Sequence, residues 1–425
     1  MMKLSEVLSA LQIAEAGELL APHWEDSEAT FPSELPPFLD PDRCAALRAF
    51  TNLQPEVDPD LVAIARQVVA NPALLHLAWH CHRLVYHHPE YSHADIARWP
   101  WLERTLGPNH GLFYLLTALS AVPQVQAFHA ARAIPEAISR DTVSHYREAM
   151  RLKWVEAEGR WTVELHALYW TRYHAWGDLY SCGRMEYMVR PFSGMVQAYR
   201  HRASGQVLAL DAGGHVFTAE GYINAGETVD SRPGNWESRF EDRGDTVVGV
   251  PIRATGQAIN TLVELKRGEW DPVLKKGDPV LDTHIPAGGG FTPDKCEHSM
   301  RLAVDFFRQF FPDRPFVGFA CGSWILDPEI RNWYDPQSNM VKWMDELYLF
   351  PYPSGPRTGM FFVFGSDRTD YANLPRDTSL RRAMADHLQA GGYCRAGGMF
   401  LLTEDLEYYG SQWYRRNWGG ELLGL

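Results

Sequence analysis

The segment spanning residues 280–307, VLDTHIPAGGGFTPDKCEHSMRLAVDFF, holds the residues best suited to chemistry. An apolar run ends in Asp282, Thr283 and His284. On an extended strand Asp282 and His284 lie two residues apart, so their side chains project from the same face. Imidazole exchanges its proton near neutral pH, and a neighbouring carboxylate can orient the ring. The pair therefore predicts a general base, His284, oriented by Asp282.

The elements that must position this pair can be read from the same segment. The apolar run predicts a strand, and the glycines at residues 288–290 predict a turn. A helix is expected from about Pro293 to Phe311. Further along, residues 360–365 (MFFVFG) predict another strand, and Gly213-Gly214 between two β-rich runs predicts a hairpin.

The chain changes character near residues 140–160. In residues 1–150 apolar side chains recur with helical spacing, as in Leu61, Ile64, Ala65, Val68 and Val69, and strand-like alternation is absent. Residues 151–425 contain several antiparallel strands followed by alternating strands and helices. We therefore predict an α+β multi-domain protein. It has an all-helical N-terminal domain (1–150) and a mixed α/β domain (151–425).

Composition excludes several function classes. The formal net charge of the 425 residues is −13, which argues against a nucleic-acid-binding face because phosphate contacts need clustered Lys and Arg. No stretch approaches 18 uninterrupted apolar residues, and the N-terminus lacks a signal-peptide pattern, so no membrane association and a cytoplasmic location are expected. The six cysteines are scattered without a C-x-x-C pair, and we expect no metal site.

Four segments carry a resemblance to a known family: GDPVLDTHIPAGG (277–289), CGSWILDPEI (321–330), SNMVKWMDELYLFP (338–351) and LPRDTSLRRAM (374–384). Through them nearly the whole chain resembles a bacterial two-domain acyltransferase family. In that family a helical N-acyltransferase N-terminal domain precedes a GNAT-like domain. The resemblance implies acyl-CoA, with acetyl-CoA the first expectation, as the co-substrate. It also implies a small-molecule acceptor, and the oligomeric state is left open.

The resemblance also implies how the opening segment would hold acyl-CoA. Residues 280–286, Ile285 included, would form a strand that diverges from its neighbour and pairs with the pantetheine arm. Gly288, Gly289 and Gly290 would form the turn before a helix whose N-terminus attracts the pyrophosphate. The sequence departs from the family pattern because no Arg or Gln precedes these glycines. A flexible loop without a ligand is the competing interpretation.

Acyl transfer from a thioester needs a base for the acceptor proton and a proton for the departing thiolate, but no protein nucleophile. Besides His284, Glu186 on an earlier strand is a second possible base. Tyr334 and Tyr348 are the candidate acids, because a GNAT tyrosine usually comes from the helix that follows the next strand. An ordinary aromatic of the core is the competing interpretation of each tyrosine.

Polar residues near the next strand are the candidate substrate contacts. Ser323 lies where the strand leaves the sheet, and Asn339 follows a helix cap at Ser338. Cys321 or Ser323 as a nucleophile is disfavoured, because neither lies in a G-x-S-x-G elbow.

Two other functions stay open at this level. The missing Arg or Gln before the glycines suits a GNAT-like scaffold that binds a metabolite without catalysis. Alternatively, Glu186, Asp282 and His284 could serve a hydrolase that acts on a sugar-like substrate. Calorimetry with acetyl-CoA and CoA separates the non-catalytic scaffold from an acyltransferase, and hydrolysis that does not depend on CoA would identify the hydrolase.

Overall fold

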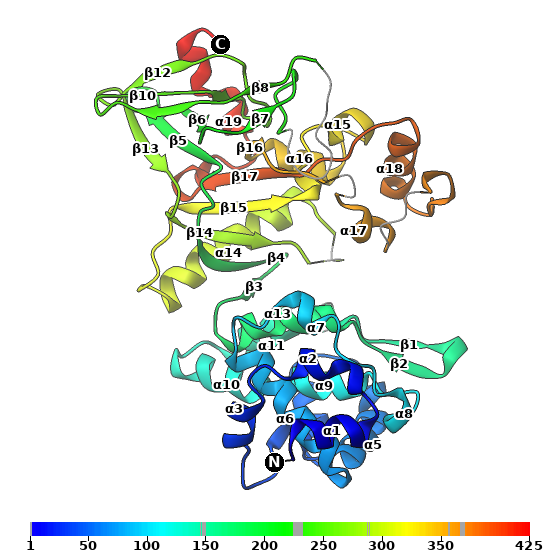
Figure 1. The fold of residues 1–425 in the computed structure, drawn as a ribbon. Helices are drawn as coiled ribbons and strands as arrows, with labels where there is room; N and C mark the ends of the chain where they lie inside the picture. The colour runs from blue at the N-terminus through cyan, green and yellow to red at the C-terminus, as the bar shows by residue number, and fades with distance from the viewer. Residues whose placement is uncertain are drawn as a thin grey trace. The chain divides into compact units, whose positions relative to one another are not determined.

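The computed structural model describes residues 2–425 except 145, 147–149, 224–232, 287, 289, 356–357 and 366–369. The chain forms two compact units, Met1–Ser181 and Cys182–Leu425 (Figure 1). The division falls later than the boundary expected near residue 150. The reason is α13 (Leu165–Ala175), which packs against α6, α7, α9 and α10 and so belongs to the first unit.

The first unit is helical, as predicted. Asn71 caps α6 by accepting a hydrogen bond from the backbone N–H of Ala73 (3.0 Å). The apolar stripe of α5 is buried at Leu61, Ile64, Ala65 and Val68. The helices are α1 Leu4–Leu11, α2 Gly17–Leu20, α3 Trp24–Ala29, α4 Cys44–Phe50, α5 Asp58–Ala70, α6 Pro72–His87, α7 His93–Ile96, α8 Glu103–Leu106, α9 Leu112–Leu119, α10 Val122–Ala131, α11 Glu136–Ser144 and α13, with a small sheet of β1 Lys153–Val155 and β2 Arg160–Thr162.

Within the described residues, no single helix has the length and apolar character needed to cross a membrane. One pair of helical segments, Pro55–Ala70 and Pro72–His87, meets those two criteria together, but the pair is bent by 110°.

The second unit is built on a six-stranded mixed sheet in the order β16-β17-β15-β14-β4-β3 (Figure 1). The central pair, β14 and β15, is parallel, and both strands have antiparallel partners on their outer sides. A four-stranded sheet, β11-β6-β5-β13, and a three-stranded sheet, β12-β10-β9, complete most of the β-structure. This mixed architecture agrees with the predicted α/β class.

The strands of this unit and its helices are: β3 Tyr180–Cys182, β4 Met185–Pro191, β5 Val196–His201, β6 Val207–Asp211, β7 Val216–Phe217, β8 Trp236–Glu237, β9 Phe240–Asp242, β10 Thr246–Gly249, β11 Pro251–Ile252, β12 Val263–Lys266, β13 Trp270–Leu274, β14 Pro279–His284, β15 Gly318–Ser323, β16 Tyr348–Pro351 and β17 Gly397–Leu402; α14 Pro293–Phe310, α15 Ile330–Trp333, α16 Asn339–Asp345, α17 Met360–Phe364, α18 Ser379–Gln389 and α19 Trp413–Arg416.

Helix α14 covers one face of the central sheet, and its bounds match the predicted helix within one residue. The Ser299 hydroxyl lies on this helix and contacts both the backbone N–H of Met185 (3.0 Å) and the Tyr187 hydroxyl (2.9 Å). Tyr187 therefore points toward α14. Because side chains alternate along a strand, Glu186 and Met188 point to the opposite face.

Two local predictions are wrong. Gly213 and Gly214 do adopt positive φ (88° and 79°), but β6 pairs with β5 and β11 while β7 pairs with β8. The glycines therefore turn the chain, but the strands on their two sides pair with other strands and do not form a hairpin with each other. Residues 360–364 form helix α17 between Gly359 and Gly365 instead of the predicted strand. The prediction failed because a short apolar run does not distinguish a strand from a buried helix.

The buried carboxyl of Asp327 should make the folding stability of the protein depend on pH. This carboxyl is 1% exposed and accepts hydrogen bonds from the backbone N–H groups of Glu329 (2.9 Å) and Arg395 (3.0 Å). Burial raises its pKa from 3.8 to about 7. Between these values the folded chain retains a proton that the unfolded chain has released. Stability should therefore fall as pH rises through this window, by up to about 1.4 kcal/mol per pH unit.

We expect Asp327→Asn to remove this contribution. The difference in thermal midpoint, wild type minus variant, should decrease as the pH is raised from 4.5 to 7.5. Asp305→Asn, at an exposed position, is the control, and its thermal midpoint should change with pH as that of the wild type does. A wild-type-minus-Asp327→Asn difference that stays constant with pH would contradict the assignment.

Candidate active site: a wedge between β14 and β15

The central feature of the sheet is a wedge between its two parallel strands. Among the described residues, β14 and β15 pair at Leu281–Phe319 and Asp282–Ala320 and no further along. Both strands continue: β14 runs to His284 along β4, and β15 runs to Ser323 along β17. The neighbours diverge while each stays anchored on its outer side. The opening is therefore part of a rigid sheet.

Three of the predicted catalytic residues share one face of this wedge. His284 and Glu186 are directly opposite each other in the antiparallel register of β14 and β4, so their side chains lie on the same face. Asp282 lies two residues before His284 and shares that face. It is the face opposite α14, because Glu186 alternates with Tyr187. The tertiary register thus brings Glu186 to the Asp282–His284 pair.

The Asp282 and His284 side chains lie within ion-pair distance of each other. Asp282 Oδ2 lies 3.2 Å from His284 Nε2. The two side chains are 36% and 26% exposed, so a ligand can reach both. Glu186, by contrast, is 2% exposed. His284 is thus the more accessible base, and Glu186 is a buried carboxyl at its side.

Tyr352 is a further residue of this face that the sequence did not indicate. Ala320 pairs with Asp282 in the parallel register, so Gly322, two residues on, shares the face of Asp282. A Cβ on Gly322 would lie 2.7 Å from the Tyr352 ring, which places that ring over this part of β15. Burial raises the pKa of Tyr352, and the charge of Asp282 raises it further. Both effects favour the protonated form of Tyr352.

The two predicted acids lie in other surroundings. The hydroxyl of Tyr348 is fully buried, donates to the Ile252 carbonyl (2.6 Å) and accepts from the backbone N–H of Ala209 (2.9 Å). These bonds join β16 to the four-stranded sheet. The Tyr334 hydroxyl lies 3.2 Å from the Ser379 hydroxyl, where α15 meets α18. Neither is brought to the wedge by a described contact.

The glycine turn lies directly after β14, as predicted. Gly288 and Gly290 have positive φ (79° and 72°), which glycine adopts without steric cost, and both are exposed. Ile285 is partly buried, and Gly289 lies outside the described residues. The turn leads into α14, whose first turn carries an acid, Asp294.

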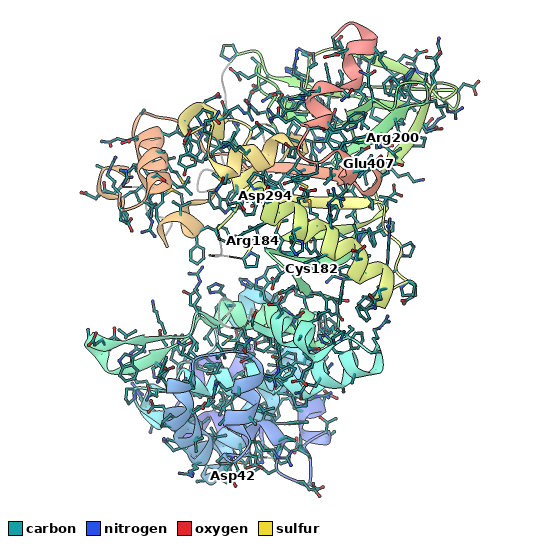
Figure 2. All side chains as sticks on the ribbon, turned by 180° about the vertical axis from the view of Figure 1, so that it is seen from behind. Asp42, Cys182, Arg184, Arg200, Asp294 and Glu407 are labelled. Carbon is teal, nitrogen blue, oxygen red and sulfur yellow. The ribbon has the colours of Figure 1, made fainter. Side chains whose placement is uncertain are left out.

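Two basic side chains that the sequence analysis missed approach this turn. Arg184 Nε donates to the Gly290 carbonyl (2.6 Å), and its guanidinium lies over the Phe291 ring at 5.2 Å. Burial lowers the pKa of Arg184. Lys295 Nζ lies 3.6 Å from where a Cβ on Gly290 would stand. Figure 2 labels Arg184 and Asp294 at the same end of α14. Arg184 comes from the β3–β4 turn, so it supplies a cation that the residues before the glycines lack.

The predicted substrate contacts have local structural roles. Ser323 ends β15, and its hydroxyl accepts from the backbone N–H of Ile325 (3.5 Å). Asn339 is exposed on the first turn of α16, behind the Ser338 cap. The Cys321 thiol is buried, and burial raises its pKa, which does not favour a nucleophilic thiolate.

Comparison with known proteins agrees with this architecture. Residues 179–400 match the family model of the GNAT-like C-terminal domain, and residues 41–177 match that of the N-acyltransferase N-terminal domain. The chain belongs to this GNAT-like two-domain acyltransferase family. The family assignment confirms the resemblance seen in the sequence. No curated protein matches the sequence significantly.

Solved structures share the fold of this GNAT-like protein. An acyltransferase in complex with CoA and 10C-teicoplanin is similar with a TM-score of 0.60 and 20% identity, over 94% of this chain and 99% of that chain. An acyltransferase in complex with decanoyl-CoA is similar with a TM-score of 0.58 and 20% identity, over 94% and 99% of the two chains. At this level of identity the likeness concerns the fold.

Proposed function

We propose that this protein is an acyl-CoA-dependent acyltransferase that acts on an amine or hydroxyl of a small molecule. The wedge between β14 and β15 carries the proposal, because it opens beside Asp282, His284 and Glu186 in a chain of the GNAT-like family. The solved structures of the same fold hold CoA, decanoyl-CoA or 10C-teicoplanin, which supports an acyl-CoA donor and a small-molecule acceptor. Acyl chains longer than acetyl therefore belong in the test.

The wedge suits the extended arm of an acyl-CoA. A pantetheine arm carries amide groups along its length, and facing edges of two diverging strands present backbone N–H and C=O groups that need partners. At the end of β14 the chain turns through Gly288 and Gly290 into α14, where Arg184 supplies positive charge. Guanidinium groups bind phosphate with directed hydrogen bonds. We infer that Arg184 contacts the CoA phosphates.

The face opposite α14 supplies the groups for acyl transfer. His284, oriented by Asp282 at 3.2 Å, accepts the proton of the acceptor amine or hydroxyl as it attacks the thioester carbonyl. A new bond to nitrogen or oxygen forms, and the carbon–sulfur bond breaks. Tyr352, whose raised pKa keeps it protonated, donates its proton to the departing thiolate. Solvent then restores both protonation states.

The first test removes the base. With acetyl-CoA and decanoyl-CoA as donors and a panel of small amines as acceptors, we expect CoA release by the wild type that depends on the acceptor. His284→Ala should lower kcat about 100-fold or more, because the positioned base is lost. The control His298→Ala, on an exposed residue of α14, should leave kcat unchanged. A wild type that neither binds CoA in calorimetry nor releases it would refute the function.

The second test concerns Tyr352. Tyr352→Phe should lower kcat by roughly 10–100-fold without weakening CoA binding, because the ring remains and only the acid is lost. Gly322→Ala should produce a similar loss by displacing the ring from β15. Gly268→Ala is its matched control, since a Cβ there meets no atom within 4 Å. Unchanged kcat in Tyr352→Phe would leave the proton donor to another group.

The third test concerns Arg184. Arg184→Ala should raise the Kd of CoA by at least about tenfold, because charge-assisted hydrogen bonds to phosphate are lost. The kcat/KM for an acyl-pantetheine, which has no phosphates, should change much less. Arg239→Ala removes an equal charge from an exposed position and should alter neither value. Equal losses with both donors would show that Arg184 only shapes the turn.

A further inference from the structure

Three metal-ligating side chains converge within the helical unit. His23 Nε2 and His88 Nδ1 both approach the same oxygen of Glu90, at 2.8 and 3.4 Å. The two imidazole rings are stacked, with centroids 3.7 Å apart and an angle of 16° between the planes. The ligand atoms of all three side chains lie within 4.8 Å of one another. His23 is far from the other two in the sequence, so spacing did not indicate this group.

The backbone at these residues is held in place by buried contacts. The backbone N–H of Tyr91 donates to the His88 carbonyl (3.0 Å) and closes a four-residue turn around Pro89, whose ring presets φ. Arg172, fully buried, donates from Nη1 to the carbonyls of Pro89 and Tyr91 (3.2 Å each). The turn therefore presents the side chains of its first and third residues in a fixed relation.

His23 is held in an unusual conformation. It immediately precedes α3 with φ +61°, a left-handed conformation that a residue with a Cβ seldom adopts. Such a conformation persists only where the surrounding structure determines it, and it recurs at ligand sites. Here it brings the His23 ring against the His88 ring.

The second nitrogen of His88 has the partner that metal-bound histidines require. His88 Nε2 lies 3.0 Å from Asp26 Oδ2, and Arg83 Nη2 contacts the same oxygen at 2.6 Å. The Asp26 carboxylate therefore contacts both side chains. With Nε2 facing Asp26, His88 Nδ1 faces the Glu90 carboxylate and is the nitrogen available to a metal ion.

We propose that His23, His88 and Glu90 bind one divalent metal ion of the Zn²⁺ type. Nitrogen and carboxylate ligands suit Zn²⁺, and ligands about 2.0–2.2 Å from the metal in a tetrahedron are separated by about 3.3–3.6 Å. The observed distance of 3.4 Å between His88 and Glu90 already matches that value, and the 2.8 Å between His23 and Glu90 must lengthen by about 0.5 Å. Asp26 would orient His88 in the carboxylate–histidine–metal arrangement.

The surroundings suit a cation with one open coordination position. His23 and Glu90 line an open pocket of about 620 Å³. The pocket wall also carries the acids Glu15, Glu18 and Asp95 against one base, Arg98. Three protein ligands leave the fourth position to water or to a small ligand in the pocket. The bound ion would also tie the start of α3 to the turn that follows α6 (Figure 1).

The test is a metal titration of the full chain, chelator-treated and without a polyhistidine tag. Calorimetry with Zn²⁺ should give one site per chain of micromolar affinity or tighter, and Zn²⁺ should raise the thermal midpoint. Co²⁺ should give the visible absorption of a four- or five-coordinate nitrogen–oxygen site. Glu90→Gln, nearly isosteric, and His23→Ala should each weaken Zn²⁺ binding at least tenfold, and Asp26→Asn by roughly 10–100-fold.

His166→Ala is the matched control, because it removes an imidazole of similar exposure that lies 3.3 Å from one carboxylate, Glu164. It should leave the Zn²⁺ affinity unchanged. Circular dichroism of each variant shows whether it is folded. The proposal is overturned if the wild type binds neither Zn²⁺ nor Co²⁺ below millimolar concentration. It is overturned equally if folded Glu90→Gln and His23→Ala bind Zn²⁺ as the wild type does.

Discussion

The constraint on which the site depends is the brief pairing of two parallel strands. Strands β14 and β15 meet at two residue pairs and then diverge, while β4 and β17 continue to hold them from outside. Two anchored strands cannot close the gap without breaking one of these outer ladders. Backbone groups inside a protein need hydrogen-bond partners, so the wedge is predisposed to take an extended, amide-bearing ligand.

Helix α14 decides which face of the wedge can do chemistry. Its contact with Tyr187 through Ser299 occupies one face, so the alternating residues of β4 and β14 meet on the other. Glu186 and His284 become neighbours through register, and Tyr352 joins them because Gly322 leaves room for its ring. A side chain at Gly322 would collide with that ring, so the bare backbone and the aromatic residue are required together.

The helical unit uses a different device to bring distant residues together. Its fixed elements are a proline turn held by a buried arginine and a histidine in a left-handed conformation. These hold His23, His88 and Glu90 in one cluster within the helical unit. In both units, backbone elements held in place by packing and hydrogen bonds thus position the side chains that could bind a ligand.

Much of the local structure could be predicted from the sequence. The apolar periodicity of α5, the helix α14 and the strand that carries Asp282 and His284 are local properties, and all were found. The short run at residues 360–364 was not, because its length suits either a strand or a buried helix. The glycines at 213 and 214 showed where the chain turns but not which strand it would then join.

By itself, the sequence determined the helical and mixed α/β halves, the family, and the pairing of Asp282 with His284, because these follow from neighbours along the chain. Only the tertiary structure decided which distant residues complete each site. Arg184 reaches the glycine turn, Tyr352 covers Gly322, and His23 stacks on His88. Strand register and long-range packing set those contacts, and neither leaves a pattern in the local order of residues.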